Sequence, residues 1–134
     1  DPTAEAVKIR LGSAVALEQE LLMEVKGRDL VSGLPKTVAV RSEEVREAIQ
    51  EPVTRIVNAV RRALEITPPE LASDLVDRGI ILTGGGALIR GLDLLIAHEI
   101  GLTVRVADDP LTCVVRGTGQ IMDQPERYHD VLTV

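Results

Sequence analysis

The most constraining feature of the sequence is an apolar run that leads directly into three glycines. Residues 80–83 read Ile-Ile-Leu-Thr, and Gly84, Gly85 and Gly86 follow them. A short, continuously apolar and β-branched run predicts a buried strand. Glycines lack Cβ atoms, so the backbone can approach a flat or anionic ligand closely. Because ligands bind at the carboxyl ends of strands in open α/β sheets, this loop is a candidate binding element.

The glycine run matches neither of the two common nucleotide fingerprints. Counting G-x-G-x-x-G from Gly84 places Ile89 where a glycine is required. The Walker pattern would need lysine and then serine or threonine at positions 92 and 93, which are leucine and aspartate. A tight turn from strand to helix, with positive φ, explains the glycines equally well. The local pattern therefore leaves both ligand binding and turn geometry open.

The first half of the chain predicts a mixed α+β arrangement. Apolar residues at helical spacing predict a helix over residues 3–15, with Thr3 as its cap. A period-two pattern over residues 22–40, with turn residues at 32–35, predicts a β-hairpin or short meander. Ser42 and two glutamates open the next helix. Pro52 is expected to split residues 42–64 into two helices, because proline fits the first turn of a helix but breaks its interior.

The second half predicts alternating helices and strands. Thr67 and Glu70 have the spacing of a capping box, for a short helix that stops at Gly79. After the strand at 80–83, we expect a helix at 91–100, a strand at 103–106, and a helix capped by Asp109 that runs through 122. This order is typical of a parallel sheet covered by helices, so the fold class is α/β. The change of character near residues 66–69 predicts two units, 1–66 and 67–134.

Composition narrows the classes of function. The 134 residues are 45% apolar, which suffices for a core without disulfides, and Cys113 is the single cysteine. The net charge of -6, with basic residues interspersed among acids, argues against a nucleic-acid partner. Tyr128 is the one aromatic residue, so no aromatic platform exists for stacking a base. No apolar run approaches membrane-spanning length and no signal sequence is visible, so we expect a cytoplasmic location.

A few polar residues could carry chemistry. Glu5 and Lys8 lie three apart and share one helix face, where they could bind ribose hydroxyls, a phosphate or an adenine edge. An ordinary surface ion pair is the simpler interpretation of the same spacing. Asp109 could lie near a ligand or a magnesium-bound water, although Asp-Pro is also a standard helix opening. His98 and His129 have no acid or cysteine at ligand spacing, so a metal site is not expected.

Five stretches of the sequence form a distinctive combination: residues 24–37, 42–48, 67–72, 77–87 and 109–114. Taken together they resemble the MreB family of bacterial actins. The glycine loop alone would indicate only the wider superfamily of actins, sugar kinases and heat-shock-chaperone ATPases. The combination is more specific, and the likeness extends from residue 3 to about 122.

The resemblance implies a partial actin-like fold and a nucleotide site. Residues 1–66 would correspond to subdomain IIB, and residues 67–134 to the C-terminal part of subdomain IIA. It implies that the glycine loop and Leu88 contact adenine and ribose, while the helix that carries Glu5 and Lys8 contacts the nucleoside from the other side. This implication favours a binding role for that pair over a surface ion pair. The implied loop residues are Gly84, Gly85, Gly86 and Leu88.

The resemblance also implies what the rest of such a protein supplies. Family members bind ATP or ADP with magnesium between two large domains, and their phosphate loops and catalytic residues come from sequence that precedes the equivalent of Asp1. We therefore expect this segment alone not to be an enzyme. The intact protein would form filaments by self-association, act with cell-shape and cell-wall synthesis proteins, and reach the membrane through elements upstream. The alternatives are a non-filamentous ATPase of the same superfamily, resembling a chaperone or sugar kinase, and a stand-alone interaction module that binds no nucleotide.

Overall fold

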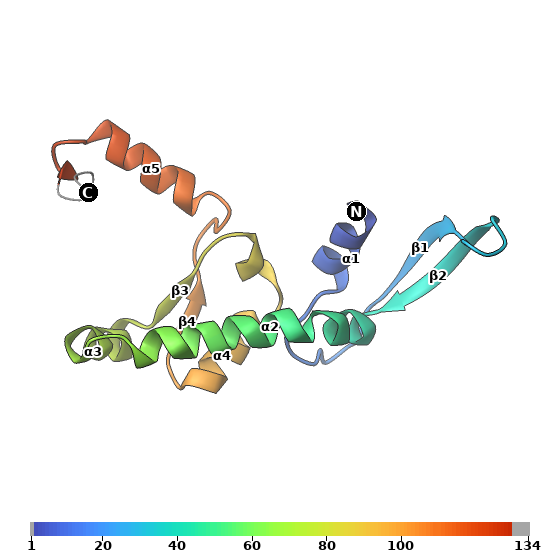
Figure 1. The fold of residues 1–134 in the computed structure, drawn as a ribbon, viewed down its shortest axis with the longest axis horizontal. Coiled ribbons are helices and arrows are strands. Elements are labelled where there is room, and N and C mark those ends of the chain that lie inside the picture. Colours follow the sequence, from blue (N-terminus) through green and yellow to red (C-terminus); the bar gives the residue numbers. More distant parts are fainter. Residues whose placement is uncertain (1, 130–134) are drawn as a thin grey trace.

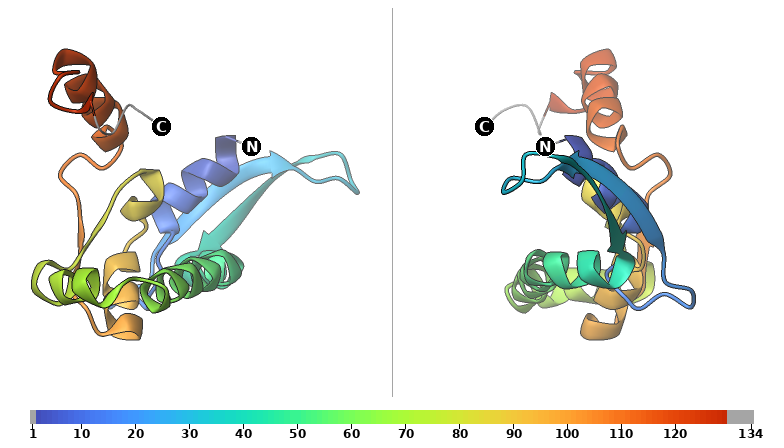
Figure 2. Two further views of the ribbon diagram at one scale, coloured as in Figure 1. Left: turned by 60° about the vertical axis from the view of Figure 1, so that its left-hand side comes forward. Right: turned by 90° about the vertical axis from the view of Figure 1, so that its right-hand side faces the viewer.

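The computed structural model describes residues 2–129 and shows an extended molecule with projections from a packed centre. A long helix, α2, runs along the centre, while a two-stranded hairpin and the last helix, α5, project away from it in different directions (Figures 1 and 2). Within residues 2–129, no helix is long and apolar enough to cross a membrane. Residues 130–134 lie outside the described residues.

The first helix, α1, spans Pro2–Leu11 and ends earlier than the predicted 3–15. The last apolar residues of the predicted stripe instead lie in the loop that follows. Gly12 is buried at the helix end, where an added Cβ would lie 2.3 Å from the carbonyl oxygen of Lys8. Ser13 then forms a parallel bridge with Arg90, and this pairing takes the chain out of the helix. Periodicity alone could not reveal this contact with a distant segment.

The predicted hairpin is present and regular. Strand β1 spans Leu22–Arg28 and pairs antiparallel with β2, which spans Pro35–Arg41. The turn between them is closed by Asp29, whose carboxylate accepts hydrogen bonds from two backbone N–H groups at 2.9 Å. Gly33 has a φ of 70° and completes the turn. At the base of the hairpin, the Leu21 backbone N–H donates to the Ser42 hydroxyl at 2.7 Å.

The expected break at Pro52 is wrong, because α2 is one helix that spans Ser42–Glu65. Proline provides no N–H for the carbonyl of Ala48, the residue four positions earlier. Both Pro52 and Ala48 lie on the exposed face of α2, so water can reach this carbonyl. Val45, Val53 and Val57 are buried on the opposite face, and their packing supports the helix on both sides of the proline.

The second half has the predicted order of helices and strands, with one short helix added. Strands β3 and β4 pair in parallel, as expected. A 3-10 helix, η1, follows the first of the three glycines. The elements are α3 (Pro69–Arg78), β3 (Ile80–Leu82), η1 (Gly85–Leu88), α4 (Leu92–Ile100), β4 (Val104–Val106) and α5 (Cys113–Asp123).

Three predicted caps are wrong, although the helices they were meant to open exist. Thr3 lies inside α1, which begins at Pro2. Thr67 does not cap α3; its hydroxyl donates to the Ala63 carbonyl at 2.7 Å, and Pro68 is the N-cap. Asp109 does not open α5, which begins at Cys113 with Thr112 as its N-cap. Asp109 instead has a φ of 50° and accepts a hydrogen bond from the Thr112 hydroxyl at 2.5 Å. Serine, threonine and aspartate stabilise turns and helix ends alike, so their spacing did not fix which residue caps.

The buried core lies where α2 crosses α4. Its buried members are Val53, Val57, Leu92 and Ile96. Two of these residues precede the boundary expected between residues 66 and 67, and two follow it. The division into 1–66 and 67–134 therefore stays a prediction, and the packed cluster crosses it.

Near the C-terminal end of the described residues, the Arg127 guanidinium lies 5.8 Å from the ring centre of Tyr128.

Candidate nucleotide-binding cleft

A cleft of about 500 Å³ opens between α1 and the glycine loop. Its volume lies within the range of about 300–1,000 Å³ that small-molecule sites occupy. Five of the six predicted site residues line it, and they come from segments about 80 positions apart in the sequence. Its full lining is Glu5, Lys8, Ile9, Gly12, Gly85, Gly86, Leu88, Ile89 and Leu111.

One wall carries an exposed ion pair. Lys8 Nζ lies 2.7 Å from Glu5 Oε2, and the two side chains are 43% and 57% exposed. An exposed pair of this kind adds little to stability, so both groups can exchange partners at small cost. The ammonium can donate to an anionic or carbonyl oxygen, and the carboxylate can accept from hydroxyl groups. The surface-pair interpretation and the binding interpretation are therefore compatible in this geometry.

The three glycines of the opposite wall do different things. Gly84 has a φ of 80°, which L side chains rarely adopt, and its N–H donates to the Pro110 carbonyl at 2.7 Å. It shapes the turn and is not among the cleft-lining residues. Gly85 and Gly86 have no positive φ, so their own backbone does not require glycine. Turn geometry thus accounts for Gly84, whereas it does not account for Gly85 and Gly86, whose role in ligand binding stays a prediction.

The space beside Gly85 and Gly86 is open. A Cβ added at Gly85 would meet only the Leu111 side chain, at 3.4 Å, and one added at Gly86 would meet nothing within 4 Å. Neither conformation nor crowding by the protein explains the missing side chains. The absence of side chains at Gly85 and Gly86 leaves their backbone accessible from the cleft.

Apolar side chains surround this opening. Ile9, Leu88 and Leu111 are all more than half exposed, and each lines the cleft. Apolar walls with a few polar groups at one side are typical of sites for small organic ligands. Sequence reasoning identified Leu88 but missed Ile9, Gly12, Ile89 and Leu111. The position of Ile9, four residues after Glu5 on the same helix face, was a signal that could have found it.

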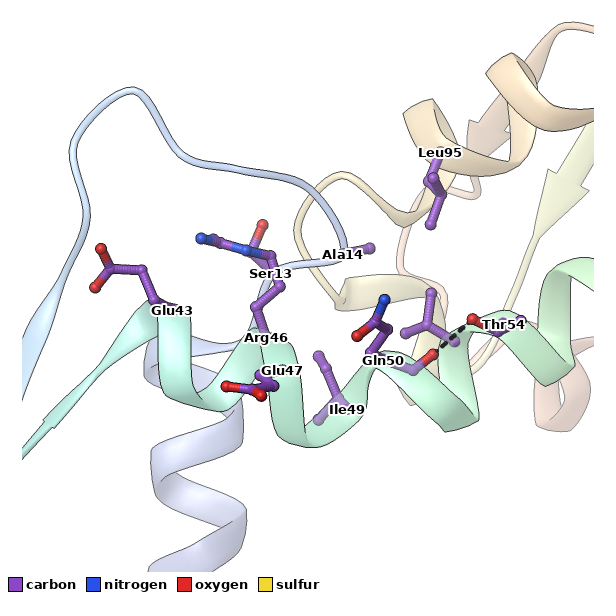
Figure 3. Close-up of a pocket in the computed structure, with 10 residues that line it drawn as sticks. Ser13, Ala14, Glu43, Arg46, Glu47, Ile49, Gln50, Thr54 and Leu95 are labelled. Atoms are coloured by element: carbon purple, nitrogen blue, oxygen red, sulfur yellow. Dashed lines mark hydrogen bonds between the residues drawn. The ribbon is translucent and has the colours of Figure 1, made fainter.

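A second cavity, of about 380 Å³, contains none of the predicted site residues. It lies between α2, the loop after α1, and Leu95 of α4 (Figure 3). Its one cationic side chain, Arg46, is already engaged, with Nη2 2.8 Å from Glu20 Oε1 and Nη1 donating to the Val15 carbonyl at 3.3 Å. Hydrogen bonds from Arg46 and Ser42 hold the pKa of Glu20 at about 2. This cavity is thus bordered by a structural ion pair at the root of the hairpin.

Residues with other chemistry do not gather into a site. Within residues 2–129, no group of three His, Cys, Asp or Glu side chains could hold a metal ion. His98 is on the surface, and its side chain is 84% exposed. Cys113 is half-buried in the first turn of α5. The cleft between α1 and η1 is therefore the candidate ligand-binding site that the side-chain chemistry supports best.

Comparison with solved structures shows the class of fold. The crystal structure of MreB5 of Spiroplasma citri bound to ADP matches with a TM-score of 0.86 and 40% identity, over 96% of this chain and 39% of that one. The structure of the same protein bound to AMPPNP matches with a TM-score of 0.84. A MamK double helical filament matches with a TM-score of 0.65 at 23% identity, which supports the fold alone. The chain has an actin-like fold.

Sequence comparison then shows the family. The family described as MreB/Mbl protein matches residues 1–130. The cell shape-determining protein MreB of Escherichia coli is 51% identical over 128 residues, and the cell shape-determining protein Mbl of Bacillus subtilis is 47% identical over 125. These alignments cover 96% and 93% of the chain. The chain belongs to the MreB/Mbl family, and it spans 37–38% of the length of these two relatives.

Proposed function

We propose that this chain forms the nucleoside-contacting part of an actin-like filament subunit that binds ATP and ADP and determines cell shape. Adenine and ribose occupy the cleft between α1 and the glycine loop. Glu5 and Lys8 act from one wall, and Gly85, Gly86 and Leu88 act from the other; Gly84 contributes by setting the turn. The phosphates, magnesium and hydrolysis depend on other parts of the complete subunit.

The observation that carries this proposal is the convergence of the predicted residues on one cleft. Chemistry supports it as well, because a lysine, a carboxylate, open glycine backbone and apolar side chains suit a nucleoside. The family relationship gives independent support, since MreB5, 40% identical to this chain, was crystallised with ADP and with AMPPNP. Relatives named as cell shape-determining proteins support the cell-shape role. In the proposed role, filaments organise cell-wall synthesis together with partner proteins.

The site is tested by Gly85→Val in a complete subunit that contains this chain, with ADP affinity measured by titration calorimetry. The backbone at Gly85 has no positive φ, so valine fits the loop and its methyl groups enter the cleft. Overpacking costs about 1–3 kcal/mol. We therefore expect ADP affinity to fall by about tenfold or more, because each 1.4 kcal/mol is a factor of ten.

Gly27→Val is the matched control. Gly27 lies in β1, has nothing within 4 Å of an added Cβ, and is far from the cleft. Valine suits a strand, so this variant is expected to bind ADP as the unmodified subunit does. Unchanged affinity in folded Gly85→Val, or equal losses in both variants, would remove the adenosine-loop assignment.

The filament role needs its own test, because the alternatives share the fold. A complete subunit is expected to sediment as filaments in ATP and magnesium. A soluble subunit with high ATP turnover would instead favour a monomeric ATPase resembling a chaperone or sugar kinase. A subunit that binds neither ADP nor ATP would favour a protein-interaction module.

A further inference from the structure

Arg90 makes three hydrogen bonds that link the two walls behind the cleft. Arg90 directly follows Ile89, which lines the loop wall. Its Nη1 donates to the backbone carbonyl of Arg10 at 2.7 Å, close to the end of α1. Its own backbone carbonyl accepts from the Ala14 N–H at 2.8 Å and from the Ser13 hydroxyl at 3.3 Å. Arg90 thus contacts the chain on both sides of the α1 C-terminus without lining the cleft itself.

The loop after α1 and the residues around Arg90 lie in close contact. Ser13 is fully buried, and its one hydroxyl proton serves mainly the Val15 carbonyl at 2.6 Å, so the 3.3 Å contact with the Arg90 carbonyl is the weaker of the two. Gly91 has a φ of 70°, and an added Cβ there would lie 2.4 Å from Val15 Cγ2. A side chain at position 91 would be strained by this φ and would force Val15 to shift. Figure 3 shows Ser13 and Ala14 in this loop, beside α2.

The side-chain contact of Arg90 with the C-terminal end of α1 is electrostatically favourable. The C-terminal end of a helix carries partial negative charge on its unpaired carbonyls, and a guanidinium there is favourable. Lys8, the cation of the cleft, lies two residues before Arg10 on the same helix. A change in the position of the α1 end would therefore move Lys8 relative to Gly85 and Gly86.

We propose that Arg90 is a positioning residue that sets the separation between the α1 wall and the glycine-loop wall at the width of a nucleoside. This inference rests on the proposed nucleotide-binding function and adds to it the group that pre-organises the cleft. A cleft held open at the width of its ligand binds more tightly, because less ordering remains to be done on binding. The Arg90 side chain makes one hydrogen bond to the Arg10 carbonyl, not a bidentate pair. A lysine that reaches the same carbonyl can therefore replace the guanidinium.

The test compares Arg90→Ala and Arg90→Lys in the complete subunit, with ADP affinity measured by titration calorimetry. Loss of one charge-assisted hydrogen bond corresponds to roughly tenfold in an equilibrium constant. We expect ADP affinity to fall by about tenfold in Arg90→Ala and to recover to within about threefold in Arg90→Lys. Rescue by lysine separates positioning from a loss of packing, because lysine restores the donor and not the shape of the guanidinium.

Arg61→Ala is the matched control. Arg61 also donates to a carbonyl near a helix C-terminus, that of Glu99 in α4, at 3.4 Å, and it forms an ion pair with the Glu99 carboxylate at 3.0 Å. It does not line the cleft. Its replacement is expected to leave ADP affinity unchanged while it lowers the melting temperature as Arg90→Ala does. Equal losses of affinity in both variants would overturn the proposal, since the effect would then be general destabilisation.

The remaining outcomes separate this inference from the function on which it rests. If the unmodified subunit binds ADP and Arg90→Ala binds it equally well, the positioning role is wrong and the nucleotide site stands. If the unmodified subunit binds no ADP, both are wrong. Should Arg90→Ala not fold, Arg90→Met decides the question. It keeps a long side chain but has no donor for the Arg10 carbonyl, so about a tenfold loss is expected, and an unchanged affinity overturns the proposal.

Discussion

Helices α2 and α4 differ from α3 and α5 in what their apolar faces meet. Val53 and Val57 of α2 pack against Leu92 and Ile96 of α4, and all four side chains are buried. In contrast, α3 and α5 contain no buried residue, although each has apolar residues at helical spacing. Val115 of α5, for example, is 66% exposed. An amphipathic pattern therefore predicts a helix and its apolar face, but not the surface that covers this face.

The largest effect expected from this difference is in Ile96→Ala. Ile96 is 0% exposed, so truncation removes buried contacts and leaves a cavity. We expect the free energy of unfolding in urea to fall by about 2–5 kcal/mol. Val115→Ala in the same chain is expected to change it by only about 0.5 kcal/mol. Similar losses in the two variants would mean that α5 is packed as tightly as α4.

A smaller effect, of opposite sign in the two kinds of helix, is expected from proline replacement. Pro52→Ala restores a backbone donor inside α2, where proline is costly, and is expected to raise the free energy of unfolding by about 1–3 kcal/mol. Pro69 is the first residue of α3, where proline is favourable. Pro69→Ala is expected to lower the same quantity by about 0.4–1 kcal/mol, through the unfolded state. Thermal melts of both variants give the signs directly, and a shared sign would contradict this account.

The smallest effect expected is a pH dependence of folding stability, which arises from Glu20 and its partners at the start of α2. The pKa of Glu20 is lowered from 4.5 to about 2 in the folded chain by hydrogen bonds from Arg46 and Ser42. The unfolded chain then binds more protons, so the stability from this carboxylate is present above pH 4.5 and is lost as the pH falls toward 2. Glu20→Gln is expected to flatten the pH dependence of urea unfolding in this window. A profile as steep as that of the unmodified chain would exclude Glu20 as a source.

Local signals predicted the elements well and their exact limits less well. Gly79 and Gly101 end their helices as expected, and the hairpin register follows the period-two pattern. The break predicted at Pro52 was wrong because the prediction considered only the local cost of proline inside a helix. Burial of Val53 and its neighbours stabilises the continuous helix and outweighs this cost. Thr67 misled because its hydroxyl found a carbonyl one turn earlier.

The cleft was predictable only where a residue carries its own signal. Glu5 and Lys8 were found by charge and spacing, and Gly85 and Gly86 by the glycine run. Leu111 has no such mark; it reaches the cleft because the Gly84 N–H is bonded to Pro110, which fixes the neighbouring residue against the loop. Arg90 is likewise silent in the sequence, because its partners lie some 80 positions away.

The position of Tyr128 has an optical consequence. It is the only aromatic residue, and it lies beyond α5, beside Arg127. Intrinsic ultraviolet absorbance and fluorescence of this segment therefore come from one end, and its core of aliphatic side chains is spectroscopically dark. A tryptophan at position 111, which is exposed at the cleft, would be the segment's sole indole emitter and would report directly on occupancy of that cleft.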